Sequence, residues 1–403
     1  MKEKRFAFAK YASINFAFYI TMTFGGYVTV FLQYIGFTAQ DVGRVTAINS
    51  GVGIFSSPFW GMLSDKLRSI KKVITFALTI GALLFVMIPW VSGLSVFGIS
   101  VLFAIIPVSM FFRMPVMSLI DNWMLRNARA EGLNYGALRA YGALSFALAA
   151  FALGFIVPRI GVQFVFYISL IFTIPAFLLL FFVRDNTNEQ TEKKKSLTFK
   201  EMQIGQLFKN YYLMSYIMFS VFQRIPFQSS MIFLPFLIYA VGGDIAQVGI
   251  IMGIRAAVEI PVMMLLKPLR QKFPLYVLII VATMFYMTQF ILYSFISTFS
   301  MVVVLSVLHG IGNGLMIPAG SSYVFSLAPE QLKATAQTVL ASVSAIAGIV
   351  GGLLGGWLIM RLDIMQFFLV IGIMLALAVG LFILSFFIGE KILGIKRPGL
   401  SLV

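Results

Sequence analysis

The residues of this sequence that could do chemistry are charged side chains inside strongly apolar segments. Asp121 ends one such segment, Arg113 lies earlier in it, and Arg139 stands near the start of the next segment. A charge at the middle of a bilayer costs about 2.5–3.5 kcal/mol on insertion scales, so such residues are usually paired and turned toward a bundle interior or a watery cavity. The pattern predicts an Asp121–Arg139 charge pair lining a solute pathway. The alternative is a structural ion pair that only locks two helices together.

The second half of the chain carries its own polar residues within apolar segments. Arg255 and Glu259 stand at i and i+4, so they can pair with each other on one helix face. His309 and Asn313 have the same spacing in a glycine-rich segment. A histidine in such a segment usually makes a hydrogen bond within the helix packing. The alternative is a histidine that gains and loses a proton during transport. Arg224 has no partner in its own segment, so it either binds a partner elsewhere or extends to the interface.

These charges also bear on the class of substrate. The apolar segments contain more arginines than carboxylates, which leaves a surplus of positive charge: the arginines are at 113, 139, 224 and 255, and the carboxylates are at 121 and 259. If most of them face a cavity, a carboxylate or phosphate is the favoured ligand, because a buried cation needs an anionic partner. If Arg113 and Arg224 point to headgroups, the cavity is balanced and a neutral sugar fits.

Composition places these residues in a membrane protein. The 403 residues are 60% hydrophobic and 11% charged, with a mean hydropathy of +0.97, which no soluble core requires. There is no cysteine and a single histidine, so disulfides, thiolate catalysis and Cys- or His-rich metal sites are excluded. The chain also has no GxSxG sequence and no phosphate-binding loop. We therefore expect no enzyme activity, no metal and no cofactor.

The apolar residues fall into twelve segments of about 20 residues or more, the length that spans a bilayer. We expect spans at 12–34, 43–63, 73–91, 96–122, 136–157, 162–183, 211–240, 247–267, 274–296, 299–325, 334–360 and 364–389. The predicted fold is all-α, with twelve transmembrane helices in two pseudo-symmetric six-helix bundles. The predicted domains are an N-terminal bundle (1–183), a cytoplasmic linker (184–210), a C-terminal bundle (211–390) and a cytoplasmic tail (391–403).

The basic residues orient the chain. The net charge is +16, and most of the 30 Lys and Arg fall in loops that share one side of the predicted bundle. By the positive-inside rule both termini are cytoplasmic. This distribution argues against nucleic acid as a partner and for a lipid bilayer. We expect a monomer in the plasma membrane of a bacterium.

The two halves resemble each other weakly. YIGFTAQDVGRV (34–45) corresponds to YAVGGDIAQVGII (239–251), and GFIVPRIG (154–161) corresponds to GWLIMRLD (356–363). Internal repeats of this kind are typical of transporters in which one half rocks against the other around a central site. The duplication favours alternating access over a fixed channel, with the solute held between the bundles.

The loop after the second segment is more specific. Gly61, Asp65, Lys66 and Arg68, followed by further lysines, resemble the G-x-x-x-D-[RK]-x-x-[RK]-[RK] loop of the major facilitator superfamily. Physically, we expect Gly61 to permit close helix approach and the basic residues to hold the cytoplasmic face. The resemblance implies a conformational role for these four residues.

Four stretches narrow the resemblance: FYITMTFGGYVTVFLQYIGF, SPFWGMLSDKL, YGALRAYGALSFALA and LHGIGNG. They are similar to the lactose-permease group of proton symporters and its arylpropionate-permease relatives. In that group a carboxylate and an arginine eighteen positions apart bind sugar, and Asp121 and Arg139 keep this spacing. The sugar-stacking tryptophan of the group falls on Phe146, which still offers an apolar platform. Tyr19, Tyr27 and Asn49 are further cavity candidates, chosen by helix position alone.

The proton route of the group does not carry over. Glu259 and His309 match its essential glutamate and histidine, but its proton-carrying glutamate is Gly312 here, and the arginine that serves that glutamate is Gln289. The resemblance therefore implies coupling through Asp121 or Glu259, with His309 and Arg255 as further candidates.

These observations predict a secondary transporter that imports a small polar solute with protons, first a sugar or short oligosaccharide. A permease for an aromatic or other organic carboxylate is the second hypothesis, on the charge count. Export of drugs or lipids and uncoupled facilitation remain alternatives. The Gly-Pro pair typical of drug/proton antiporters is absent from Ala143–Pro158.

Overall fold

The computed structural model describes residues 2–181, 183, 207, 209–329 and 332–397. The chain divides into two compact units: unit 1 comprises 1–194 with 244–253, and unit 2 comprises 195–243 with 254–403. The predicted linker, 184–210, lies almost entirely outside the described residues, as does the end of the predicted tail, 391–403. The predicted domain boundaries therefore stay predictions.

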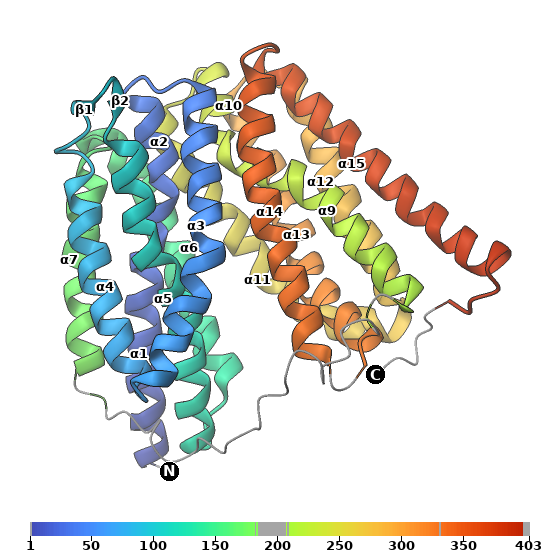
Figure 1. The fold of residues 1–403 in the computed structure, drawn as a ribbon, viewed down its shortest axis with the longest axis horizontal. Helices are drawn as coiled ribbons and strands as arrows, with labels where there is room; N and C mark the ends of the chain where they lie inside the picture. The colour runs from blue at the N-terminus through green and yellow to red at the C-terminus, as the bar shows by residue number, and fades with distance from the viewer. Residues whose placement is uncertain (1, 182, 184–206, 208, 330–331, 398–403) are drawn as a thin grey trace. The chain divides into compact units, whose positions relative to one another are not determined.

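Unit 1 is a helical bundle (Figure 1). Its helices are α1 (Lys2–Thr23), α2 (Tyr27–Tyr34), α3 (Ala39–Lys66), α4 (Ile70–Met87), α5 (Leu102–Ala130), α6 (Tyr135–Ile160) and α7 (Phe164–Phe181). A 3₁₀ turn, Phe24–Gly26, joins α1 to α2, so that Lys4–Tyr34 is one apolar stretch. Helix α1 packs against α6 and α7, while α5 packs against α3 and α4.

A short antiparallel hairpin, β1 (Ser95–Val96) and β2 (Ile99–Ser100), connects α4 to α5. Its two turn residues, Phe97 and Gly98, both have positive φ, of 52° and 78°. Positive φ at both central positions is the geometry that matches the twist of two short strands. The rest of the described secondary structure is helical.

Unit 2 is also helical. It contains α9 (Tyr211–Ile232), α10 (Leu234–Ala240), α11 (Val248–Lys272), α12 (Leu275–Tyr293), α13 (Phe299–Leu327), α14 (Lys333–Ile359) and α15 (Ile364–Phe387). Its main contacts are α12 with α13 and α15, and α9 with α14 and α15. The first residues of α11 cluster with unit 1, as do those of the 3₁₀ turn Ile245–Gln247 before it.

Ten described helical stretches are long and apolar enough to span a membrane. The pair α9 and α10, bent by 52°, passes the same test when joined. Helix α3 covers the predicted span 43–63 with 28 residues, and it carries charged side chains near both ends, at Asp41, Arg44, Asp65 and Lys66. The all-α membrane fold is therefore confirmed, and the count of twelve spans stays a prediction.

Local sequence explains where several helices begin. Asn134, Asn210 and Asp363 each accept a hydrogen bond from a backbone N–H in the first turn of α6, α9 and α15. Short polar side chains at this position satisfy amides that have no partner within the helix. The cap of α6 is relevant to function because it fixes where Arg139 lies, one turn into the helix.

Candidate functional site

Unit 1 brings together the two charges that the sequence pairs. Arg139 on α6 lies with its Nε 3.4 Å from Oδ1 of Asp121 on α5, and the two side chains are 38% and 28% exposed. Tyr19 on α1 donates a hydrogen bond of 3.0 Å to the same Asp121 oxygen. The Arg139 guanidinium also stacks 4.3 Å from the centre of the Tyr19 ring. Three helices thus supply one cluster of a cation, an anion and an aromatic hydroxyl.

Close packing of α1 on α6 holds Tyr19 in this cluster. A Cβ at Gly142 would lie 2.6 Å from the Tyr19 ring, so only glycine leaves room for it. Asn15, one turn before Tyr19, donates a 2.8 Å hydrogen bond to the Leu138 carbonyl. The ring is 2% exposed, whereas the charged groups that it contacts are partly accessible. The partial exposure suits a site that an outside ligand reaches.

Tyr135, which the sequence argument did not name, interacts with both Asp121 and Arg139. It precedes Arg139 by one helical turn, so the two side chains share a face of α6. That i, i+4 spacing from a candidate arginine was the available signal. The cluster therefore has two tyrosine hydroxyls beside one ion pair.

Three other predicted binding residues of unit 1, Phe146, Asn49 and Tyr27, have no described contact with this cluster. Phe146 is half-buried two turns beyond Arg139, about 10 Å along the helix axis. Asn49 is half-buried on α3, and its buried Oδ1 has no hydrogen-bond partner among the described residues. Tyr27 is fully buried and donates a 3.4 Å hydrogen bond to the Ala246 carbonyl. Their roles in binding stay predictions.

Arg113 is buried, with 3% of its surface exposed. Its Nη2 donates a 3.0 Å hydrogen bond to the Thr21 carbonyl, and its guanidinium lies 4.1 Å from the centre of the Phe85 ring. A Cβ at Gly81 would lie 2.8 Å from its Cγ. Its Nη1 is buried without a hydrogen-bond partner among the described residues. The backbone and aromatic contacts on its other sides are those of a packing arginine, and its burial does not fit an arginine that faces headgroups.

Unit 2 contains a polar chain that includes Glu259. Asn313 on α13 donates a 2.7 Å hydrogen bond to Glu259 Oε2 on α11. Tyr286 on α12 in turn donates a 3.0 Å hydrogen bond to the Asn313 side-chain oxygen. Glu259 therefore accepts from Asn313, and the pairing with Arg255 that the i, i+4 spacing allows stays a prediction. Asn313, expected to bind substrate, is the residue that links the other two.

Arg255 is 4% exposed. Its Nη1 lies 3.0 Å from the Met231 sulfur, and its Nε and Nη2 have no hydrogen-bond partner among the described residues. A buried guanidinium with unsatisfied donors is unfavourable unless an acceptor reaches it. Arg224 is half-buried, and its charge and those of Arg255 and Glu259 all act on the Tyr286 hydroxyl. These charges therefore lie in one neighbourhood of unit 2.

His309 lies in a second polar chain. Its Nδ1 is 3.2 Å from Gln289 Oε1, and Gln289 donates a 2.8 Å hydrogen bond to the Tyr293 hydroxyl. The imidazole is 3% exposed and stacks on the Phe227 ring with a centroid separation of 5.2 Å. This environment is that of a hydrogen-bonded packing histidine, which was one of the two interpretations of the sequence.

The glycines around His309 permit close contact between helices. A Cβ at Gly310 would lie 2.7 Å from the Arg255 carbonyl oxygen, and one at Gly314 would lie 2.8 Å from the Glu259 carbonyl oxygen. At Gly312 a Cβ would lie 2.8 Å from the Tyr286 ring. Gly310 and Gly314 thus let α13 pack closely against the turns of α11 that carry Arg255 and Glu259, and Gly312 leaves room for the Tyr286 ring.

The loop motif lies at the end of α3. Asp65, Lys66 and Arg68 are exposed, and Arg68 adopts a left-handed conformation with φ of 50° just after the helix ends. The expectation that Gly61 permits close helix approach is wrong in this structure, since a Cβ there would meet no atom within 4 Å. A larger residue would therefore fit at position 61, and glycine is not required there for any described contact between helices.

Comparison with known proteins decides the family. The model of the MFS_1-like family matches residues 9–370. The chain belongs to the MFS_1-like family. The maltose permease of Geobacillus stearothermophilus is 24% identical over 358 residues, which cover 87% of each chain. The uncharacterized transporter YwbF of Bacillus subtilis (strain 168) is 24% identical over 347 residues, 85% of this chain and 84% of that protein.

Solved structures share the fold of this MFS_1-like protein. A single-residue variant of the nucleoside transporter NupG has a TM-score of 0.81 at 17% identity, covering 95% of this chain and 100% of that one. A POT family transporter has a TM-score of 0.71 at 16% identity, covering 96% of each chain. The predicted resemblance to the major facilitator superfamily is thereby confirmed, and the protein is a membrane transporter. Among its described residues no group of His, Cys, Asp or Glu is arranged to hold a metal ion.

Proposed function

We propose that this transporter takes up a small polar solute, first a sugar or short oligosaccharide, by proton symport with alternating access. The observation that carries the proposal is the Asp121–Arg139–Tyr19 cluster, whose charged groups are partly exposed. A carboxylate and a guanidinium side by side offer acceptors and donors to the hydroxyl groups of a sugar. The similarity to a maltose permease supports the same class of solute.

Proton coupling needs a carboxylate that gains and loses a proton during transport. Asp121 and Glu259 are the two candidates within the long apolar helices. Protonation of a buried carboxylate removes a charge that opposes closure, so the loaded and the empty forms can both change conformation. His309 and Arg255 remain proposed contributors, although the hydrogen bond to Gln289 gives His309 a packing role as well.

The test is uptake into proteoliposomes that contain an interior pH dye, with a panel of sugars and organic acids added outside. We expect one class of solute to acidify the interior, and the signal to disappear in Asp121→Asn or Glu259→Gln. Asp41→Asn, which changes a partly exposed carboxylate of α3, is the matched control. The proposal is refuted if an Asp121→Asn, Glu259→Gln double variant still accumulates solute against a gradient.

A second candidate, an organic carboxylate as substrate, is favoured by one observation. The buried Arg255 guanidinium has two donor atoms without a hydrogen-bond partner among the described residues. An anionic substrate would supply the missing acceptors. In the same panel, Arg255→Gln would then abolish uptake of carboxylates selectively, whereas a role of Arg255 in coupling would lower the acidification by every solute alike. If labelled solute equilibrates without acidification, the protein is an uncoupled facilitator.

The proposal also includes orientation and assembly. We place both termini on the cytoplasmic side of a bacterial plasma membrane, because most basic loops share that side, and we expect a monomer. A protease site added after Val403 should be cut in inverted vesicles and protected in intact spheroplasts. Cutting in spheroplasts alone would reverse the orientation.

A further inference from the structure

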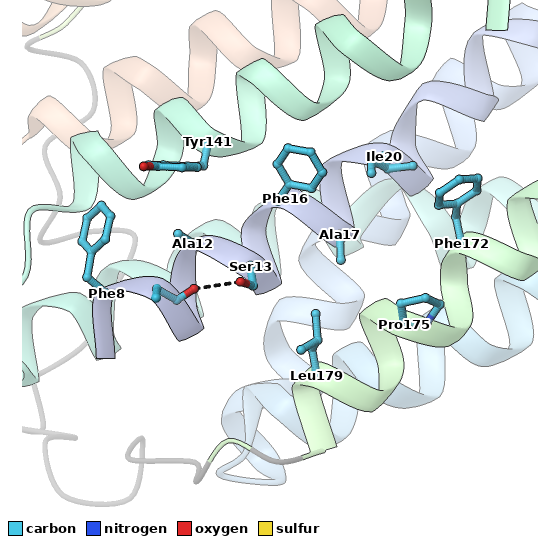
Figure 2. Close-up of a pocket in the computed structure, with 11 residues that line it drawn as sticks. Phe8, Ala12, Ser13, Phe16, Ala17, Ile20, Tyr141, Phe172, Pro175 and Leu179 are labelled. Carbon is cyan, nitrogen blue, oxygen red and sulfur yellow. Dashed lines mark hydrogen bonds between the residues drawn. The ribbon is translucent and has the colours of Figure 1, made fainter. Parts of the chain in front are cut away.

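A cavity on unit 1 lies outside the charged cluster. It has a volume of about 540 Å³ and runs between α1, α6 and α7 (Figure 2). This volume is within the range of specific small-molecule sites, about 300–1,000 Å³. Its larger lining side chains are Phe8, Phe16, Ile20, Tyr141, Phe172 and Leu179. We call this cavity the lateral groove.

Small residues on one helix create the lateral groove. Ala9, Ala12, Ser13 and Ala17 of α1 lie in its lining, where larger side chains would fill the space. The Ser13 hydroxyl donates a 2.9 Å hydrogen bond to the Ala9 carbonyl, so it presents little unsatisfied polarity to the groove (Figure 2). The lining is thus apolar apart from the hydroxyl of Tyr141. An apolar groove on a membrane-spanning bundle suits hydrocarbon rather than a polar solute.

The length of the groove fits one lipid chain. From Phe8 to Ile20 the α1 residues that line it span about 18 Å at 1.5 Å per residue. The hydrocarbon core of a bilayer is about 30 Å thick, so the groove covers about the depth of one leaflet. Phe8 lies at one end of the lining and Phe172 toward the other (Figure 2). The Tyr141 ring is 44% exposed and meets Phe8 edge to face at 5.8 Å.

The Phe8 end of the groove is cationic. Lys4 and Arg5 are exposed and lie one helical turn before Phe8 and Ala9, on the same face of α1, and Lys10 follows. At the end of α7, just beyond Leu179, Lys71 donates hydrogen bonds of 3.0 and 2.6 Å to the carbonyls of Phe181 and Val183. These contacts are to neutral carbonyl oxygens, so the positive charge of Lys71 is not cancelled by them.

Among the described side chains near this end, Glu131 is a carboxylate. It accepts a 3.3 Å hydrogen bond from the Tyr11 hydroxyl, on the α1 face that packs toward α5, and the Lys4 Nζ lies 3.5 Å from where a Cβ at the neighbouring Gly132 would lie. The described lysines and arginines outnumber this carboxylate, and a phosphate group beside them would be attracted. An apolar groove one leaflet deep that ends among cations matches the shape and charge of an anionic phospholipid.

We propose that the lateral groove binds one anionic phospholipid, with an acyl chain along α1 between α6 and α7 and the phosphate beside Lys4, Arg5 and Lys10. The site is separate from the proposed transport cluster and does not depend on the identity of the solute. The fraction of molecules with a lipid in the lateral groove would then depend on the content of anionic phospholipid in the membrane.

The test uses the delipidated full chain in detergent, equilibrated with equal amounts of phosphatidylglycerol and phosphatidylcholine of identical chains. Bound lipids are counted by native mass spectrometry. We expect one retained lipid with a clear preference for phosphatidylglycerol. Lys4→Gln with Lys10→Gln should reduce this preference about tenfold, because each cation near a surface phosphate contributes severalfold. Lys267→Gln with Lys272→Gln, at the end of α11, is the control for net charge.

Blocking the groove tests the acyl-chain half of the proposal. Ser13→Phe should remove the retained lipid, whereas Leu381→Phe on the exposed face of α15 should keep it. Phosphatidylglycerol should also raise the thermal midpoint of the wild type more than that of Ser13→Phe. Equal retention of both lipids by the wild type would overturn the proposal, as would an unchanged preference in the double glutamine variant. Because the glutamine variants leave the groove intact, the test holds even if Ser13→Phe fails to fold.

Discussion

Replacing Asp121 by asparagine separates a binding pair from a structural one. The Arg139–Asp121 contact is a single 3.4 Å approach, and both side chains are more than a quarter exposed. Ion pairs exposed to this extent contribute about 0.2–1 kcal/mol to stability. The asparagine side-chain oxygen also keeps an acceptor for the Tyr19 hydroxyl. We therefore expect Asp121→Asn to lower the free energy of unfolding by about 1 kcal/mol or less.

Transport should respond much more strongly to the same change. If Asp121 accepts a hydrogen bond from the solute, the substitution removes a charge-assisted bond, worth about 1.5–3 kcal/mol. That loss corresponds to about a 10- to 150-fold decrease in uptake at low solute concentration. The assays are chemical unfolding in detergent and initial uptake rates in proteoliposomes, both normalised to folded protein.

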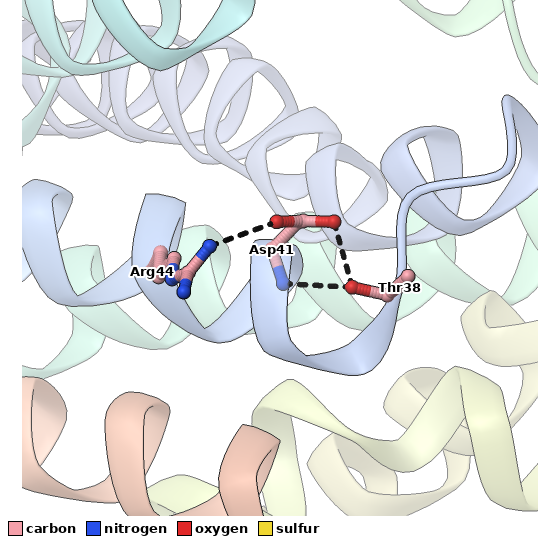
Figure 3. A network of polar contacts seen from close by, with 3 residues as sticks. All are labelled: Thr38, Asp41 and Arg44. Atoms are coloured by element: carbon pink, nitrogen blue, oxygen red, sulfur yellow. Dashed lines mark hydrogen bonds and ion pairs between the residues drawn. The ribbon is translucent and has the colours of Figure 1, made fainter. Parts of the chain in front are cut away.

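The chain offers a closely matched control at the start of α3. Asp41 accepts a 2.6 Å hydrogen bond from the Thr38 hydroxyl and lies 3.5 Å from Arg44 (Figure 3). Its side chain is 31% exposed, against 28% for Asp121. Asp41→Asn thus makes the same chemical change at a carboxylate of similar exposure, in an ion pair of similar length. We expect a similarly small loss of stability and unchanged uptake.

One pattern of results would refute this reasoning. Breaking a buried pair typically destabilises by about 3–5 kcal/mol, because one charge is left uncompensated. If Asp121→Asn has a loss of that size and the folded fraction still transports at the wild-type rate, the pair only locks α5 to α6. The cluster would then be a structural ion pair.

Three further predictions concern packing. Gly312→Ala places a methyl group against the Tyr286 ring and should lower the free energy of unfolding by about 1–3 kcal/mol. The control, Gly380→Ala, meets no atom within 4 Å and should leave stability unchanged. Equal thermal midpoints for the two variants would contradict this prediction. Gln289→Leu leaves buried hydrogen-bonding partners unpaired and should cost about 1–3 kcal/mol in chemical unfolding; a shifted pH profile of uptake in this variant would assign His309 to coupling. Arg113→Met, which replaces a buried charge with an apolar chain, should change stability by about 1 kcal/mol or less and preserve uptake; a tenfold loss of uptake would assign Arg113 to transport.

The sequence was sufficient to predict the ion pair, because two charges in adjacent apolar segments have few ways to avoid hydrocarbon. It did not predict that Tyr19 completes the cluster as both donor and stacking surface. That contact depends on α1 approaching α6 at Gly142, a tertiary distance that spacing along one helix cannot reveal. Tyr135 was missed although its i, i+4 relation to Arg139 was visible.

In unit 2, too, contacts between helices could not be predicted from spacing along one helix. Helical spacing indicated that Arg255 and Glu259 can pair, but it could not show that the carboxylate also accepts a hydrogen bond from Asn313, which belongs to another helix. The glycine-rich contact at 310–314 was foreseen as a pattern, whereas its partner, the α11 backbone beside those two charges, required the fold. At Gly61 the pattern suggested close packing where the structure has open space.

The residues around His309 argue that proton coupling, if present, does not follow the route of the lactose-permease group. Gln289 is neutral and bonds to both His309 and Tyr293, so it satisfies the histidine without a charge. The space at Gly312 is occupied by the Tyr286 ring, which in turn bonds to Asn313. A glutamate restored at 312 would therefore displace Tyr286 and break the chain that reaches Glu259. Because the neutral residues fit one another, Gly312→Glu alone should lower stability without creating coupling, and the carboxylates at 121 and 259 remain the groups to test.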